Sequence, residues 1–216
     1  MSDPTVPVTA VAFDFGGVLT YSAFGGLRDY ERELALPTDT LVREFRDGAE
    51  MARLEVGETT ARDFFKHVCV TTERAHGQRL DIRRLAVAAG EGERLNPAML
   101  ALVEQVRRYC PTALVTNNVA AAGWRGTFPF ELFSVVIDSS DVGVRKPDPA
   151  IYLELLRRVD RRPEQVAFVD DLPRNVDAAA ALGIAPILFT DEDACRAELV
   201  RLGALPTHDQ QGQPCA

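Results

Sequence analysis

Polar side chains that could do chemistry follow four short apolar segments of this sequence. In chain order they are Asp14, then Thr116, Asn117 and Asn118, then Lys146, then Asp170 and Asp171. Each alone has a structural explanation, because Asp and Thr commonly cap helices and a loop lysine is commonly solvated. Their occurrence after four successive segments is harder to explain in that way. If the segments are parallel strands of one sheet, these groups converge at one edge.

Such a group has a specific chemical capacity. Three neighbouring aspartates repel one another unless a cation lies among them, and an all-oxygen ligand set suits Mg²⁺. The Lys146 ammonium and the Thr116 hydroxyl, with nearby backbone N–H groups, could hold the oxygens of an anion. Asp14 is then left as a carboxylate nucleophile of the kind that forms an aspartyl-phosphate. Attack by water on that intermediate would release phosphate.

The segment that ends at Asp14 predicts a central strand. Residues 8–13 are nearly all apolar and rich in β-branched side chains, which is typical of a buried parallel strand. Gly16 and Gly17 follow and let the backbone turn sharply and approach a ligand. We therefore expect Asp14 at the carboxyl end of a buried strand.

Strand and helix patterns alternate after about residue 94. Strands are expected over 113–116, 134–138, 166–169 and 185–189, and helices over 97–109, 149–159, 175–182 and 193–202, with a turn or short helix over 119–126. This alternation predicts an α/β fold, a Rossmann-like doubly wound parallel sheet with helices on both faces.

Residues 21–93 show helical patterns and no strand signal. We expect a helix that stops before Pro37, and a second that is capped by Thr38 or Asp39 and reaches Met51. A third helix would be capped by Thr59 or Thr60. The last helix of this insert would cover 82–89. The predicted organisation is a core domain of residues 8–20 and 94–205, a helical cap domain of 21–93 and a disordered tail of 206–216.

Composition excludes several classes of protein. The net charge of −8 over 216 residues argues against nucleic-acid binding. No apolar run reaches transmembrane length and the N-terminus does not resemble a signal peptide, so we expect a cytoplasmic protein with no membrane partner. Four scattered cysteines indicate reduced thiols rather than a zinc site or disulfides. The sequence does not specify an oligomeric state.

Four segments resemble, in order, the four motifs of the haloacid dehalogenase-like (HAD) hydrolases. They are residues 13–19, 115–118, 145–152 and 168–175. The resemblance covers about residues 8–205 and is strongest to the branch with the phosphatase domain of soluble epoxide hydrolase and bacterial sugar-phosphate phosphatases. It implies a type C1 cap for the helical insert, Mg²⁺ as cofactor, and a small phosphorylated substrate such as a sugar phosphate.

The resemblance also implies residue roles. The catalytic residues would be Asp14, as nucleophile, and Lys146. The metal ligands would be Asp14, the Gly16 carbonyl, Asp171 directly and Asp170 through water. The phosphate-binding residues would be Thr116, Asn117, Gly16 and Gly17. The supporting residues would be Asn118 and Asn175.

One position departs from the family pattern. Family phosphatases usually carry a second aspartate two residues after the nucleophile, as general acid and base, whereas this chain has Gly16. The main hypothesis is a Mg²⁺-dependent phosphatase. The first alternative is a 2-haloacid dehalogenase, a branch that also lacks this aspartate; the paired Asp170 and Asp171 argue against it. The second alternative is a scaffold with weak or no catalysis.

Specificity is expected to come from the cap. Apolar side chains near the mouth of the site are candidates for substrate contact, although most such residues serve as the core of the cap. They are Tyr21, Phe24, Phe45, Met51 and Trp124.

Overall fold

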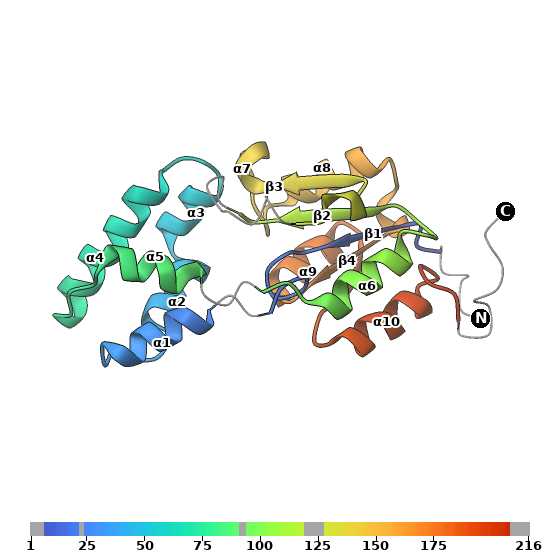
Figure 1. Cartoon of the computed structure of the whole chain (residues 1–216). Helices are drawn as coiled ribbons and strands as arrows, with labels where there is room; N and C mark the ends of the chain where they lie inside the picture. The colour runs from blue at the N-terminus through green and yellow to red at the C-terminus, as the bar shows by residue number, and fades with distance from the viewer. Residues whose placement is uncertain (1–6, 22–23, 91–93, 119–127, 208–216) are drawn as a thin grey trace.

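The computed structural model describes residues 7–21, 24–90, 94–118 and 128–207 and contains one parallel sheet (Figure 1). Its strands are β1 (Ala10–Phe13), β2 (Thr112–Thr116), β3 (Val135–Asp138), β4 (Val166–Asp170) and β5 (Ala185–Leu188), in the spatial order β3-β2-β1-β4-β5. In the register of the central strand, Phe13 lies opposite Leu114 on one side and Val169 on the other. The predicted doubly wound α/β fold is confirmed, and each predicted strand is found to within one residue at each end, except that β1 begins at Ala10, two residues after the predicted start.

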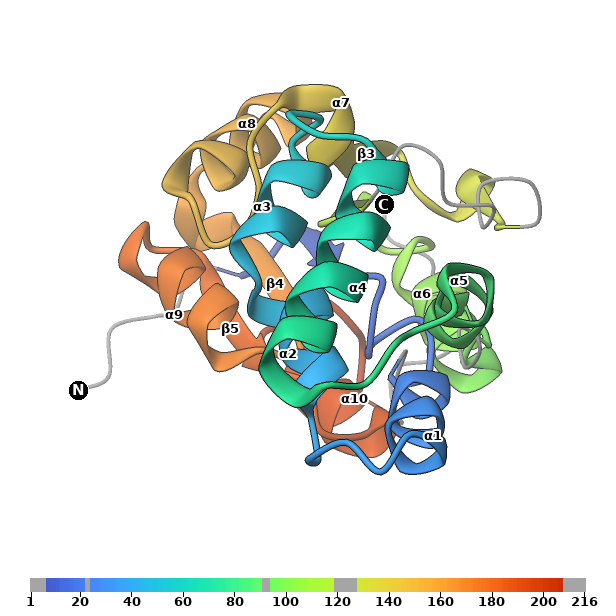
Figure 2. The ribbon, with the colours of Figure 1, turned by 90° about the vertical axis from the view of Figure 1, so that its left-hand side faces the viewer.

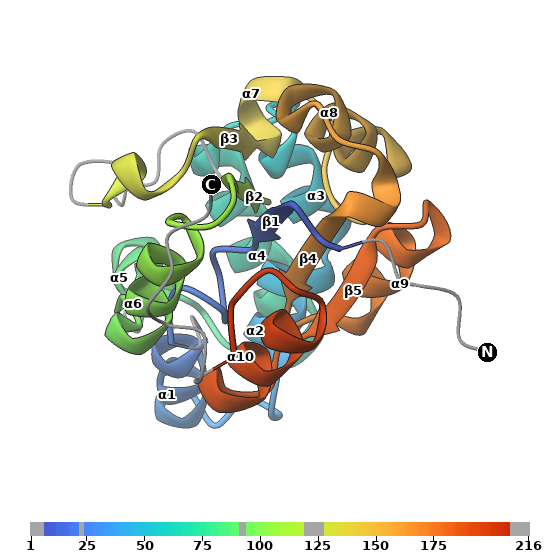
Figure 3. The ribbon, with the colours of Figure 1, turned by 90° about the vertical axis from the view of Figure 1, so that its right-hand side faces the viewer.

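Helices cover both faces of the sheet (Figures 1 and 3). Val11 and Phe13 of β1 belong to the core beneath α6 (Pro97–Val106) and α10 (Glu192–Arg201). The small side chains of Ala10 and Ala12 belong to the opposite core, beneath α8 (Pro149–Val159) and α9 (Pro173–Ala181). Because β1 is buried on both faces, the carboxylate that follows it is held on a rigid element.

A second group of helices lies beyond the carboxyl ends of the strands (Figures 1 and 2). It consists of α1 (Gly25–Glu33), α2 (Thr40–Asp47), α3 (Ala49–Glu55), α4 (Ala61–His76) and α5 (Ile82–Gly90), which we call the helical unit. The unit has its own apolar core, which includes Leu27, Leu41, Phe64, Val68 and Leu85. It therefore packs as a separate body above the sheet edge.

The chain enters and leaves the helical unit side by side. Thr20 and Leu95 form an antiparallel bridge, Tyr21 N–H donates to the Arg94 carbonyl at 2.9 Å, and Asn96 N–H donates to the Leu19 carbonyl at 2.8 Å. The predicted cap boundaries stay predictions, because residues 22–23 and 91–93 lie outside the described ranges.

Two predicted helices of the insert differ from the structure. The helix expected to reach Met51 is two helices, because Gly48 between α2 and α3 has an extended backbone with ψ of 140°. The first helix ends at Glu33, and Ala35 then adopts a left-handed φ of 52°. The cap predicted at Thr60 is confirmed, since its hydroxyl accepts from Asp63 N–H at 3.2 Å.

The predicted side-chain cap of the second helix is wrong. Asp39 occupies the N-cap position of α2, but its side chain makes no capping hydrogen bond. The buried Glu31 carboxylate of α1 accepts instead from the N–H groups of Asp39, Leu41 and Val42 at 2.9, 2.6 and 3.1 Å. A contact between helices thus replaces the local cap that the sequence suggested.

In the sheet unit, α6 ends at Val106 rather than residue 109, and α9 begins at Pro173, two residues before the predicted start. The short helix α7 (Ser139–Val142) was not predicted. The turn expected over 119–126 and residues 208–216 of the expected tail lie outside the described ranges. Within those ranges, none of the helices combines the length and apolar character needed to cross a bilayer.

Candidate active site

A cavity of about 630 Å³ lies between the sheet edge and the helical unit. All but one of the residues predicted for the site line it: Asp14, Gly16, Gly17, Thr116, Asn117, Asn118, Lys146, Asp171 and Asn175. The remaining predicted residue, Asp170, is fully buried behind this lining. The tertiary structure therefore brings together groups that are separated by up to 161 positions in the chain.

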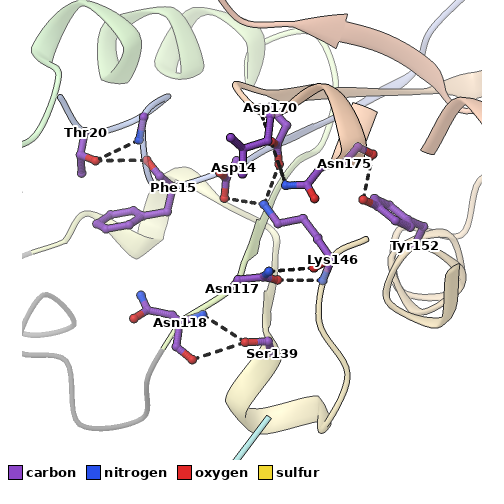
Figure 4. A network of polar contacts seen from close by, with 12 residues as sticks. Asp14, Phe15, Thr20, Asn117, Asn118, Ser139, Lys146, Tyr152, Asp170 and Asn175 are labelled. Atoms are coloured by element: carbon purple, nitrogen blue, oxygen red, sulfur yellow. Dashed lines mark hydrogen bonds and ion pairs between the residues drawn. The ribbon is translucent and has the colours of Figure 1, made fainter. Parts of the chain in front are cut away.

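Lys146 lies between two aspartates (Figure 4). Its ammonium Nζ is 2.5 Å from Oδ1 of Asp14 and 2.7 Å from Oδ2 of Asp170, and its side chain is only 1% exposed. Asp14 directly follows β1, and Asp170 is the last residue of the neighbouring strand β4. The Asp14 N–H donates to the Val169 carbonyl of β4 at 2.9 Å. The sheet register thus sets the spacing that the single ammonium bridges.

Asp170 is held by donors of the protein on both oxygens. Besides Lys146, the Leu172 N–H donates to Oδ1 at 2.9 Å, and Asn175 Nδ2 lies 3.0 Å from each oxygen. The Tyr152 hydroxyl donates to the Asn175 carbonyl at 2.8 Å and so fixes the start of α9 (Figure 4). Asp170 is a fixed anchor for Lys146, whereas Asp171 faces the cavity.

The loop that carries Lys146 is held by Asn117. The Asn117 amide accepts from the Lys146 N–H at 2.8 Å and donates to the Lys146 carbonyl at 2.9 Å. Asn117 directly follows β2, so the end of this strand positions Lys146, which contacts the carboxylates at the ends of β1 and β4. This pair of hydrogen bonds gives the asparagine a structural role in the site.

The two glycines after Asp14 have different surroundings. Gly17 has a φ of 80°, and a Cβ there would overlap the Asp171 carboxylate. A Cβ at Gly16 would meet no atom within 4 Å, and its φ is not left-handed. Glycine is therefore required at position 17, while position 16 faces open space in the cavity.

The site holds more negative charge than its own cation balances. Burial raises the pKa of Asp14 to about 8, with Asp170 adding to the rise and Lys146 opposing it. Burial, then the charge of Asp170, raises the pKa of Asp171 to about 6. Ligand oxygens of Asp14, Asp170 and Asp171 all lie within 4.8 Å of one another. These residues fit a divalent cation, which would neutralise the charge that Lys146 leaves uncompensated.

Three of the apolar residues predicted at the mouth of the site line the cavity: Phe24, Phe45 and Met51. Tyr21 is outside this lining and 46% exposed, and Trp124 lies outside the described residues.

Glu55, a buried residue of α3 for which no role was predicted, also lines the cavity. Its carboxylate pairs with Arg145 Nε at 2.6 Å, and its carbonyl accepts from the Ser139 hydroxyl at 2.7 Å. Arg174 of α9 forms a further ion pair with Asp47 of the helical unit. Arg145 and Arg174 lie within the motif segments 145–152 and 168–175, so the sequence could have indicated that they are near the site. Glu55 lies in an amphipathic helix outside these segments, where a glutamate does not indicate a functional position.

Residues 8–183 match the family described as haloacid dehalogenase-like hydrolase. Acyl-CoA dehydrogenase family member 10 of Mus musculus is 30% identical over 92% of this chain and 19% of its own length. Bifunctional epoxide hydrolase 2 of Sus scrofa is 30% identical over 89% of this chain and 38% of its own length. The chain thus spans less than two fifths of either of these relatives.

Other similar proteins match over most of their own length. Phosphatase MT3486 of Mycobacterium tuberculosis is 27% identical, over 92% of this chain and 96% of its own. A HAD family enzyme of Bacteroides thetaiotaomicron, solved with magnesium and inorganic phosphate, superposes with a TM-score of 0.63 at 20% identity, over 85% of this chain and 96% of its own. The latter shows a shared fold. Because the family match extends over most of the chain and includes the lysine and aspartate cluster at the sheet edge, the chain belongs to the haloacid dehalogenase-like hydrolases.

Proposed function

We propose that this hydrolase is a Mg²⁺-dependent phosphomonoesterase that acts through an aspartyl-phosphate on Asp14. The observation that carries the proposal is the buried cluster of Asp14, Lys146 and Asp170 beside Asp171, at the floor of the cavity between the sheet edge and the helical unit. A carboxylate beside a cationic group at the carboxyl end of a central strand can attack phosphorus in line. The phosphatase and the magnesium and phosphate complex among the similar proteins support this assignment.

In the proposed reaction, an Asp14 oxygen attacks the phosphorus atom and the bond from phosphorus to the alcohol oxygen breaks. The departing oxygen takes a proton from water, because position 16 carries no side-chain acid. A second water then attacks the phosphorus, phosphate leaves, and the Asp14 carboxylate is restored. Lys146 offsets the charge of the nucleophile throughout, and Thr116, buried at the end of β2, would bind a phosphate oxygen.

Asp14, Asp171 and the Gly16 carbonyl are the groups that would hold the magnesium ion directly. Asp170 would contribute through water, because both of its oxygens already accept from Lys146, Leu172 or Asn175. The ion would supply charge stabilisation for the transferring phosphoryl group.

The test is phosphate release from a panel of phosphomonoesters, with Mg²⁺ or with chelator, for the protein and for Asp14→Asn. We expect release that needs Mg²⁺ and is lost in Asp14→Asn. Reduction with borohydride during turnover should convert the acyl phosphate at position 14 to homoserine, which mass spectrometry detects. A folded protein that releases no phosphate from any ester would contradict the proposal, and chelator-resistant halide release from 2-chloropropionate would point to the dehalogenase alternative.

A further inference from the structure

The wall of the cavity opposite the catalytic floor is apolar. The helical unit contributes six partly exposed apolar side chains to the lining: Phe24, Phe45, Met51, Ala61, Phe65 and Ala89. The Phe45 ring packs edge-on against Phe64 and Phe65, with ring centroids 5.0 and 5.8 Å apart. These side chains pack on the core of the helical unit and keep one face toward the cavity. The wall is therefore a preformed apolar surface.

The arginine side chains that line the same cavity are paired with carboxylates of the protein itself. Four arginines reach it, and each is paired with a carboxylate: Arg28 with Asp39, Arg46 with Asp47, Arg145 with Glu55, and Arg174 with Asp47. The Asn117 amide is similarly committed to the backbone of Lys146. A sugar placed here would exchange hydrogen bonds with water for contacts with apolar carbon, and this disfavours its binding.

We propose that the substrate is the monophosphate ester of an apolar alcohol. Its phosphate would lie at the floor beside Asp14 and Lys146, and its hydrocarbon part against Phe24, Phe45 and Met51. The reaction rests on the proposed phosphatase function, whereas the preference for an apolar ligand rests on the cavity wall alone. This preference differs from the sugar phosphate that the family resemblance suggested.

The first experiment compares phosphate esters of primary alcohols, so that the leaving group stays constant. Ethyl, butyl, hexyl and octyl phosphates, kept below the concentrations at which they aggregate, should show kcat/KM rising about fourfold per methylene, the factor expected for burying one CH₂ group. Sorbitol 6-phosphate is the matched polar ester, since it has the six carbons of hexyl phosphate with added hydroxyls. We expect hexyl phosphate to exceed it by about 100-fold or more.

Variants locate the preference on the cavity wall. Met51→Gln replaces one unbranched side chain of the wall with a polar one of similar length, and it should flatten the chain-length series while ethyl phosphate changes little. Leu153→Gln makes a comparable change on α8, at a side chain that is 54% exposed and outside the lining. It should keep the slope of the unaltered protein. Equal slopes in Met51→Gln and the unaltered protein would overturn the assignment to this wall.

Binding separates failure of this inference from failure of the proposed function. Alkyl phosphonates have a P–C bond that a phosphatase does not hydrolyse, and calorimetry with ethyl and octyl phosphonate measures the preference without turnover. Tighter binding of the octyl compound, with no ester hydrolysed, would reject the phosphatase and keep the apolar ligand. Hydrolysis of sorbitol 6-phosphate as fast as hexyl phosphate would keep the phosphatase and reject the apolar ligand.

Discussion

At the scale of single residues, Gly16 and Gly17 show how differently two adjacent glycines can be constrained. Gly17 is fixed by its positive φ and by the Asp171 carboxylate, whereas a side chain at position 16 would extend into open cavity. The structure therefore has room for an aspartate at position 16, although the sequence has glycine there. Restoring the acid is a direct test of the proposed chemistry.

Gly16→Asp should raise kcat toward alkyl phosphates, because protonation of a poor leaving group contributes about 10²- to 10⁴-fold in general acid catalysis. The gain should be much smaller with phenyl phosphate, whose leaving group is stable without a proton. Steady-state kinetics on both esters measures the difference. Gly17→Asp is the control, and it should lose activity because of its backbone strain and overlap with Asp171. An unchanged ratio between the two esters would mean that another group supplies the proton.

Asp14 predicts how the metal-free protein responds to pH. Its pKa rises from 3.8 to about 8 on folding, chiefly through burial, so the folded state holds this proton more tightly than the unfolded state. The resulting stability is present below about pH 4 and is lost as pH rises toward 8. Urea unfolding in chelator at pH 5, 6.5 and 8 should show the unaltered protein losing stability relative to Asp14→Asn. Parallel losses in both proteins would contradict this expectation.

At the scale of elements, side chains from one element supply hydrogen bonds that cap or hold another element. Glu31 of α1 caps α2 from a distance, and Asn117 after β2 holds the loop of Lys146. The same kind of contact joins the helical unit to the sheet unit, since Glu55 of α3 pairs with Arg145, which is next to Lys146 in the chain. We expect this pair to couple the placement of the helical unit to the position of Lys146.

A double-mutant cycle on Glu55→Gln and Arg145→Gln tests that coupling. Both side chains are largely buried, at 9% and 22% exposed, so a coupling of about 1 kcal/mol or more in unfolding free energy is expected. Each single change should also raise KM. The pair of Arg162 and Glu164, with side chains 69% and 46% exposed, is the control and should show a much smaller coupling. Additive effects at Glu55 and Arg145 would exclude a role in joining the two units.

At the scale of the whole molecule, the cavity lies between two separately packed bodies, which are joined by the ion pairs of Glu55 with Arg145 and of Asp47 with Arg174. Because the carboxylate cluster is short of positive charge, a divalent cation should bind the folded chain and not the unfolded chain. Such binding stabilises a protein by about 2.7 kcal/mol when the free ion is at 100 times its dissociation constant.

Thermal unfolding at pH 8 should therefore show a higher Tm with Mg²⁺ than with chelator. The increase should be lost in Asp171→Asn, which removes a carboxylate of the cluster. It should persist in Asp160→Asn, an exposed position at the end of α8 whose left-handed backbone asparagine also tolerates. A Tm that does not respond to the ion in the unaltered protein would argue against the metal site.

The sequence by itself determined the α/β fold and most of the residues at the sheet edge. Strand patterns with the length and apolar character of buried parallel strands are local signals. Three of the strands lead directly into a polar group, as β1 leads into Asp14, and Lys146 follows β3 after a loop. These polar groups then lie close together because parallel strands have their carboxyl ends at the same edge of the sheet. This is why residues as distant as Asp14 and Asp171 could be assigned to one site before any contact was known.

Only the tertiary structure decided which of these groups form ion pairs with one another and which face the cavity. That Lys146 bridges Asp14 and Asp170, while Asp171 faces the cavity, depends on loop geometry that no local pattern encodes. The cap of α2 by Glu31 and the pairing of Glu55 with Arg145 likewise join separate elements. The physical reason is that secondary structure follows from nearby residues, whereas burial, ion pairing and the shape of a cavity arise only when distant elements pack together.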